Sequence, residues 1–256
     1  MTERRFPGVL FLIAVLLLWE VIARLAIVRP PVFLPPITEI IATLWRLTLS
    51  LELPGHVAIT AGRCLTGLVG AAAIGVPLGL LIGHSKAASA LLGPTLEALR
   101  PMPPAALIPV AILFLGIDSA MKIAVITFGC LWPILLNTVA GVHALDAVLI
   151  DTARTLRLGR RRFLWEVVIK GASPYIFTGI RISLAIALIL SIVTEMIAGN
   201  TGVGHFLILS ERSFLFSEMY AGLLAVGLTG FLLNHTFVYL VDRHLLRWHK
   251  AFRATL

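Results

Sequence analysis

The sequence predicts an all-α membrane protein, a polytopic bundle of about six transmembrane helices. Of its 256 residues, 59% are hydrophobic and 13% are charged, about half the charged fraction of a typical soluble domain. The mean hydropathy is +0.98. So little charge cannot cover a globular surface, and lipid is therefore the expected solvent for much of the chain. The composition excludes a disordered chain, a disulfide-rich secreted module and most soluble enzymes.

Six apolar runs carry the prediction, each near the roughly 20 residues that a spanning helix needs. They cover residues 8–28, 57–82, 88–115, 120–142, 176–198 and 219–241. The first run follows a basic start and imitates a signal peptide, but its apolar character resumes after Glu20, which favours an uncleaved anchor. The third run contains Pro101, Pro103 and Pro104, so we expect a bent helix or two half-helices there.

A proline-bounded segment, residues 30–54, lies between the first two runs. Its apolar residues follow helical spacing behind a cap predicted at Thr38. They are Ile37, Ile40, Ile41, Leu44, Trp45 and Leu47. Such a helix either lies at the membrane surface or packs on the bundle. We therefore expect an N-terminal region, 1–56, with an anchor and an amphipathic helix, and a core, 57–250, of five spans.

The net charge of +8 is distributed unevenly along the chain. With the N-terminus inside, most of the 21 basic residues fall in inside segments, especially in residues 143–174. The excess of Lys and Arg in cytoplasmic loops then places both termini and this loop in the cytoplasm. The charge is thus mainly topological, and we expect no nucleic-acid partner.

Small and polar residues inside the runs indicate close packing and a candidate path. Gly67, Ala71, Gly75, Gly79 and Gly83 recur every four residues, which brings a neighbouring helix close. Polar groups at membrane depth are costly and usually face the bundle interior or a cavity. They are Arg63, Glu97, Arg100, Asn137, Arg181, Glu195 and Asn234. From these and the proline cluster we select a candidate translocation path: Arg100, Pro101, Pro103, Asn137 and Glu195. A purely structural hinge at the prolines is the alternative.

The longest predicted cytoplasmic loop, residues 143–174, is the most informative segment. We expect a helix to begin at Asp151-Thr152-Ala153, because acid in the first turn and arginines later suit the helix dipole. The segment also has an apolar side. It either rests on anionic lipid or docks into another protein.

The order of several short stretches resembles the membrane subunits of bacterial ABC importers, in the nitrate, sulfonate, taurine and bicarbonate permease family. The resemblance covers about residues 30–250. The stretches are Ala61-Gly62-Arg63 with Gly67, GVPLGLLIGHS (75–85), LRPMPPAALIPVAILFLGI (99–117), PILLNTVAGV (133–142), ARTLRLGRRRFLWEVVI (153–169), PYIFTGIRISLAIAL (174–188) and EMIAGNTGVG (195–204).

In such permeases the cytoplasmic loop carries a Glu-Ala-Ala motif, then a glycine and later Leu-Pro, and its helix inserts in a groove of the ATPase subunit. Asp151, Thr152 and Ala153 stand at the motif positions, Arg157 replaces the glycine, and Ile169-Lys170 replaces Leu-Pro. The resemblance implies a coupling helix at about 151–163. It assigns ATPase coupling to Asp151, Thr152, Ala153, Arg154, Leu156, Arg157, Gly159, Arg160 and Phe163.

The resemblance also implies the assembly and the cargo. It implies a type I importer fold, a second permease subunit as in a homodimer, two ATP-binding cassette subunits and an extracytoplasmic solute-binding protein in a bacterial inner membrane. The cargo would be a small, often anionic solute such as a sulfonate, taurine or nitrate.

Motifs for chemistry are missing from the sequence. No Gly-x-x-x-x-Gly-Lys-Ser/Thr phosphate loop occurs, so ATP and Mg are expected on the partner ATPase. His-Glu-x-x-His, Cys-x-x-Cys and Gly-x-Ser-x-Gly do not occur either, and we expect no metal, cofactor or catalytic residue. The rivals are a self-contained channel or secondary transporter, a membrane-embedded enzyme and a scaffold that recruits a cytoplasmic protein.

Overall fold

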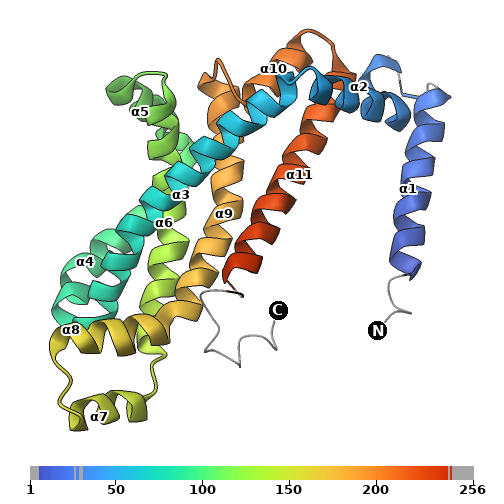
Figure 1. Cartoon of the computed structure of the whole chain (residues 1–256). Helices are drawn as coiled ribbons and strands as arrows, with labels where there is room; N and C mark the ends of the chain where they lie inside the picture. The colour runs from blue at the N-terminus through green and yellow to red at the C-terminus, as the bar shows by residue number, and fades with distance from the viewer. Residues whose placement is uncertain (1–5, 26, 29–30, 242, 244–256) are drawn as a thin grey trace. The chain divides into compact units, whose positions relative to one another are not determined.

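A computed structural model describes residues 6–25, 27–28, 31–241 and 243 (Figure 1). Within these ranges every regular element is a helix, which confirms the all-α prediction. The elements are α1 (Phe6–Arg24), η1 (Pro31–Phe33), α2 (Ile37–Leu49), α3 (Glu52–His84), α4 (Lys86–Leu99), η2 (Pro104–Leu107), α5 (Ile108–Leu115), α6 (Ser119–His143), α7 (Ala147–Thr155), α8 (Arg160–Phe163), η3 (Leu164–Ile169), α9 (Lys170–Ala198), α10 (Val203–Arg212) and α11 (Phe216–Leu240). The terminal residues predicted to be cytoplasmic, 1–5 and 244–256, lie outside the described residues.

The described helices include four that are long and apolar enough to cross a membrane. They are Glu52–His84, Ser119–His143, Arg160–Ala198 and Phe216–Leu240. A bent pair, Lys86–Leu99 with Pro104–Leu115, adds a fifth crossing if it counts as one span. The first predicted run coincides with α1, which is 19 residues long.

The predicted interruption of the third run is confirmed. Its two helical parts meet at 85°. Pro101, Pro103 and Pro104 lack the backbone N–H that an α-helix needs, and each also disfavours helical backbone at the residue before it. The helix therefore ends at Leu99 and resumes at Pro104.

The chain forms two compact units, Met1–Ile59 with Glu195–Thr229, and Thr60–Thr194 with Gly230–Leu256. The predicted division at residues 56 and 57 is not tested by this grouping and stays a prediction. The contacts do show that residues 195–229 belong with the N-terminal part. Each unit has its own apolar core, and the candidate sites are described unit by unit.

The first unit packs α2 against its neighbours through Ile40 and Leu47, which are buried with Phe206 and Ala221. Two other residues of the predicted apolar stripe are exposed, Ile41 at 55% and Trp45 at 67%. One face of α2 therefore packs on its neighbours, and a position at the membrane surface stays a prediction. The predicted cap at Thr38 is wrong. Pro36 occupies that position without a side-chain hydrogen bond.

Thr38 instead binds Glu20 on α1. Its hydroxyl donates to Glu20 Oε1 at 2.9 Å, and Arg24 Nε donates to the same oxygen at 2.7 Å. The indole N–H of Trp19 donates to the carbonyl of Pro35 at 3.1 Å. These bonds fasten α1 to the segment that leads into α2.

The second unit is built on the close approach of α3 and α6. A Cβ added at Gly79 would lie 2.6 Å from Thr138 Cβ, and one added at Gly83 would lie 2.7 Å from Val142 Cβ. The small-residue stripe therefore packs helix on helix, as predicted. Cys64 and Cys130 are fully buried in the same core as free thiols.

Candidate functional site

The loop predicted to be cytoplasmic folds into a short helix, α7, below the end of the second unit's bundle (Figure 1). The carboxylate of Asp146 caps α7 by accepting from the backbone N–H of Val148 at 2.9 Å. The predicted start at Asp151 is therefore wrong by four residues. Sequence reasoning overlooked Asp146, whose carboxylate is a strong N-cap ahead of an apolar turn.

Ala153 is the one buried residue of α7, at 4% exposure. With Ile150 and Leu158 it borders a cavity of about 430 Å³ that also touches His84 and Phe163. An adjoining side of the segment exposes apolar side chains, with Val148 at 70% and the C-cap residue Leu156 at 66%. The helix thus sits on the unit through one alanine and presents an apolar face outward.

A left-handed residue ends α7. Arg157 has φ +48°, its N–H donates to the carbonyl of Arg154 at 2.9 Å, and the N–H of Leu158 donates to that of Ala153 at 3.2 Å. This pair of bonds is the Schellman motif, in which the left-handed position is usually glycine. The resemblance leads one to expect glycine at residue 157, because glycine adopts this left-handed conformation without strain. Arginine adopts it at a conformational cost.

The predicted coupling helix at 151–163 is two helices separated by a turn, not one. Beyond the turn, α8 and the six-residue π-helical segment η3 lead directly into α9, so Arg160–Ala198 is one long helix. Phe163 packs on the ring of His84 with centroids 5.9 Å apart. Val168 is buried with Val142 against the ends of α6 and α9. The loop is therefore packed against the ends of α3, α6 and α9.

The predicted coupling residues lie on one connected segment but differ in exposure. Ala153 is buried and Phe163 is half-buried. The exposed members are Asp151, Thr152, Arg154, Leu156, Arg157, Gly159 and Arg160. Asp151 and Arg154 form an exposed ion pair at 3.2 Å. The exposed set is thus available to a partner, while the buried pair holds the loop in place.

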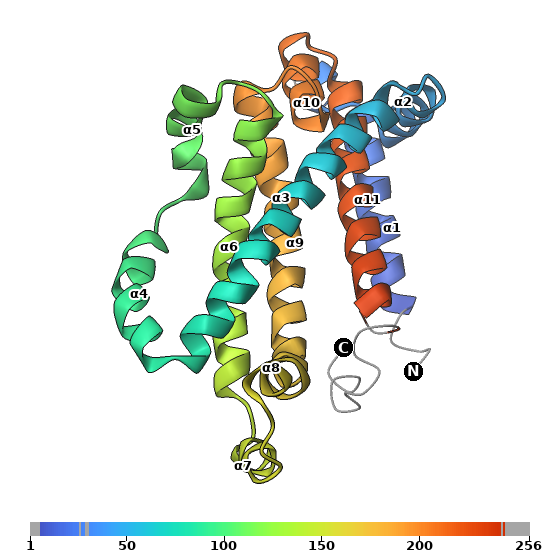
Figure 2. The ribbon, with the colours of Figure 1, turned by 60° about the vertical axis from the view of Figure 1, so that its left-hand side comes forward.

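The predicted path residues fall at three separate places. Arg100, Pro101 and Pro103 are exposed at the break between α4 and η2, which Figure 2 shows as an extended stretch. Asn137 is half-buried in the middle of α6 and donates to the carbonyl of Pro133, in its own helix, at 2.8 Å. The structure does not bring Asn137 and the residues of this break together around one cavity.

Glu195, the fifth path residue, is fully buried in the first unit. Its carboxylate accepts from the backbone N–H of Gly204 at 3.0 Å. Gly202, with φ +102°, carries no side chain and so leaves room for this carboxylate. The N–H of Gly202 in turn donates to His56 Nδ1 at 3.1 Å. Glu195 therefore holds the turn that starts α10, and its place in the path stays a prediction.

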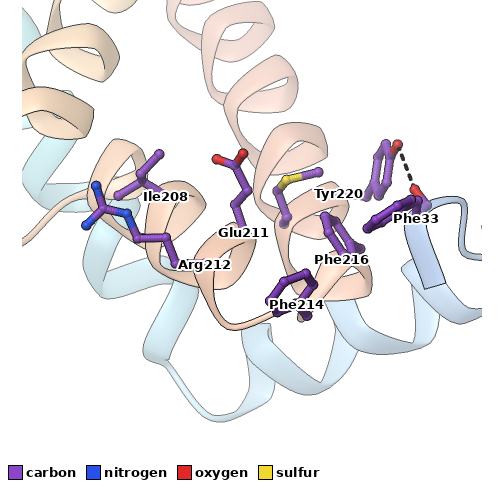
Figure 3. Close-up of a pocket in the computed structure, with 8 residues that line it drawn as sticks. Phe33, Ile208, Glu211, Arg212, Phe214, Phe216 and Tyr220 are labelled. Atoms are coloured by element: carbon purple, nitrogen blue, oxygen red, sulfur yellow. Dashed lines mark hydrogen bonds between the residues drawn. The ribbon is translucent and has the colours of Figure 1, made fainter. Parts of the chain in front are cut away.

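An aromatic hollow of about 490 Å³ lies in the first unit, lined by α10, the start of α11 and η1. Figure 3 shows Phe33, Phe214 and Phe216 gathered at one end, with Arg212 pointing away from them. The hydroxyl of Tyr220 donates to the carbonyl of Phe33 at 3.3 Å. Aromatic rings beside polar groups are typical of the membrane–water interface.

Two buried polar residues of α6 escaped the sequence reasoning. Lys122 is fully buried and donates to the carbonyl of Ile117 at 2.7 Å. Trp132 is 8% exposed, and its indole N–H has no acceptor among the described residues. Lys122 could have been found as a charge inside an apolar run. Trp132 could not have been found in this way, because tryptophan is a common residue in apolar runs.

Among the described residues, no group of three or more His, Cys, Asp or Glu could hold a metal ion.

Comparisons with known proteins agree with the geometry of a transport subunit. Residues 75–249 match the family described as binding-protein-dependent transport system inner membrane component. A permease from Bacillus subtilis (strain 168), SsuC, whose name assigns it provisionally to aliphatic sulfonates transport, is 34% identical over 247 residues, covering 96% of this chain and 89% of that protein. The taurine transport system permease protein TauC of Escherichia coli (strain K12) is 31% identical over 253 residues, 93% and 88% of the two chains. The bicarbonate transport system permease protein CmpB of a Synechocystis strain is 29% identical over 250 residues, 91% and 86%.

Proposed function

Because the chain belongs to the family of binding-protein-dependent transport system inner membrane components, we propose that it is the membrane subunit of an ATP-driven importer for a small anionic solute. Permeases of this family are non-catalytic transport subunits that cross the membrane several times. The finer points of the proposal are the energy source, the partners, the orientation and the solute.

The observation that carries the ATP-driven mechanism is the two-sided character of α7. One side is seated on the second unit by Ala153, and an adjoining side exposes Val148 and the C-cap residue Leu156. A short amphipathic helix of this kind fits an apolar groove on another protein. The proposed partner is an ATP-binding cassette subunit, which holds ATP and Mg, and arginines beside the helix suit an acidic rim on that partner.

The mechanism follows from the packing behind α7. ATP binding closes two cassette subunits, which move the α7 helices of two permease copies. The contact of Phe163 with His84 passes this displacement to α3, and the burial of Val168 against Val142 passes it to α6 and α9. Ridges packed as tightly as those of α3 on α6 move as a body rather than deform. The spans then alternate between inward-facing and outward-facing states.

The solute and its delivery are proposed from the relatives. Their names mention aliphatic sulfonates, taurine and bicarbonate, which share a compact, negatively charged oxygen-bearing group. A separate extracytoplasmic binding protein would supply the solute to a dimer of this chain. The proposed orientation, with both termini and the α7 loop in the cytoplasm, follows from the positive-inside rule, and the inner-membrane location follows from the family.

The test is ATP-dependent uptake by the purified chain, reconstituted in liposomes with the cassette and binding proteins encoded beside it. We expect solute accumulation and solute-stimulated ATP hydrolysis only when all the proteins are present. Uptake by the chain alone would favour a channel or secondary transporter. Stable co-purification with the cassette protein, but no uptake of any sulfonate, taurine or bicarbonate, would favour a scaffold.

A further inference from the structure

A cavity of about 260 Å³ lies between α9 and the C-terminal part of α11, both of which belong to the second unit there. Its lining residues are Leu184, Ala185, Leu188 and Ile189 of α9 and Gly230, Leu233 and Asn234 of α11. A Cβ added at Gly230 would lie 2.9 Å from Leu188 Cδ2, so the missing side chain keeps this space open. Apart from the amide of Asn234, the lining side chains are apolar.

Arg181 stands at one end of this cavity. It lies one turn before Leu184 and Ala185 on the same face of α9, and its Nε donates to Asn234 Oδ1 at 3.4 Å. The side chain is half-buried. A guanidinium has five N–H groups, and the other four make no hydrogen bond or ion pair with a described residue. The apolar cavity therefore ends at a cation with unused donors, and no carboxylate lines it.

The position of Arg181 along α9 places the cation near one membrane surface. It lies five residues inside the apolar run predicted at 176–198, which is about 7.5 Å of helix rise, and a long basic side chain at that depth reaches the headgroups. The α9 residues that line the cavity follow about 5–12 Å deeper.

The end of α11 marks the same surface. Tyr239 is 50% exposed, and the guanidinium of Arg243 lies over its ring at 5.6 Å. Aromatic and basic residues are enriched where a membrane meets water. Under the predicted orientation this is the cytoplasmic surface, at the end of the second unit that carries α7 (Figure 1).

We propose that the cavity holds an acyl chain of an anionic phospholipid from this leaflet, and that Arg181 and Asn234 bind its phosphate. The guanidinium fork matches the geometry of a phosphate. Asn234 Oδ1 already accepts from Arg181, so its amide nitrogen is a further donor beside it. The site is independent of the transported solute and of the energy source.

A phospholipid fits these groups better than a second copy of the chain or a soluble anion. In a two-fold dimer centred on this patch, two Arg181 guanidinium groups would approach each other with no carboxylate between them. A soluble anion would bind Arg181 but leave the apolar lining unused. A lipid with a choline headgroup would bring a second cation to the guanidinium, which favours an anionic headgroup.

Binding is measured by native mass spectrometry on the full chain in mild detergent, with phosphatidylglycerol and phosphatidylcholine of identical acyl chains as probes. We expect the wild type to bind one phosphatidylglycerol about tenfold more tightly than phosphatidylcholine. Arg181→Gln should reduce this preference to about twofold or less, and Arg181→Lys should retain part of it. Arg100→Gln removes the same charge from an exposed residue of the same unit and should keep the full preference.

Ala185 provides a steric test of the acyl-chain part. It lines the cavity but is exposed, so a larger side chain there leaves the core intact. Ala185→Leu and Ala185→Phe should weaken both lipids progressively. The same changes at Ala73, an exposed alanine of α3, should weaken neither. Glycerol 3-phosphate, which has the phosphate but no acyl chain, should not compete at equal concentration.

Four results would overturn the proposal. They are no preference in the wild type, the full preference in Arg181→Gln, an equal loss in Arg100→Gln, and competition by glycerol 3-phosphate at equal concentration. A fifth concerns the second copy: if Ala185→Phe separates a dimer of the full chain while lipid binding stays unchanged, the patch is a contact between copies and not a lipid site.

Discussion

Replacing Ala153 with arginine tests whether the seating of α7 is needed for transport. A guanidinium at this position enters the cavity beside Arg154 and Arg160. At an effective dielectric constant of about 20, two like charges about 7 Å apart repel by about 2 kcal/mol. Solvent at the two exposed arginines reduces this to about 1 kcal/mol for each pair.

Partial burial of the new cation adds about 2 kcal/mol, at the lower end of the desolvation penalties found in proteins. The sum is on the order of 4 kcal/mol, which lowers the ratio of seated to unseated α7 about a thousandfold. A nine-residue helix that packs through one buried side chain has too few contacts to offset this destabilisation. We therefore expect ATP-dependent uptake to fall below about one hundredth of the wild-type rate.

Uptake is measured in proteoliposomes, and membrane insertion is followed by resistance to alkaline extraction. Ala147→Arg is the matched control, because Ala147 is an exposed alanine on the same helix. It should keep most of the uptake. If Ala153→Arg inserts normally and transports at the wild-type rate, α7 does not transmit force from its seat, and the reasoning is refuted.

Three further substitutions test the local structure. Arg157→Gly removes the left-handed strain at φ +48° and should slow hydrogen exchange in α7, with a gain of about 1 kcal/mol; unchanged or faster exchange would contradict the Schellman assignment. Gly79→Val forces two helices apart and should destabilise the purified protein by at least about 2 kcal/mol in thermal unfolding, whereas Gly62→Val, which meets no atom within 4 Å, should not; equal melting of the two would refute the close packing. Glu195→Ala leaves the N–H of Gly204 without its carboxylate and should raise protease cleavage before α10, at a cost of about 2 kcal/mol; an unchanged cleavage rate would show that the turn holds without it.

The elements that could be predicted are those with a strong local signal. Apolar length located four helices long enough to span and the bent pair, fewer than the six spans predicted, and missing proline N–H groups located the break at Leu99. The small-residue stripe predicted the close face of α3, because a glycine every four residues has few other uses. These features depend on residues near one another in the chain, so periodicity alone reveals them.

The elements that could not be predicted depend on contacts distant in sequence. The residues around Glu195 in the sequence do not indicate that its carboxylate binds the N–H of Gly204. The geometry of the turn before α10 determines this contact. Trp132 becomes unusual only when the folded chain leaves its buried indole N–H without an acceptor among the described residues. The start of α7 is an exception, because the carboxylate of Asp146 is a local cap signal that could have been recognised ahead of Asp151.

The central claim is that the exposed face of α7 contacts a cassette ATPase during transport, and a site-directed cross-link tests it most directly. The two native cysteines, Cys64 and Cys130, are fully buried, so Val148→Cys creates an accessible thiol on that face. We predict that a short bifunctional reagent joins this thiol to the cassette subunit in the assembled complex and stops ATP-dependent uptake. Failure to cross-link in a complex that still transports would contradict the claim.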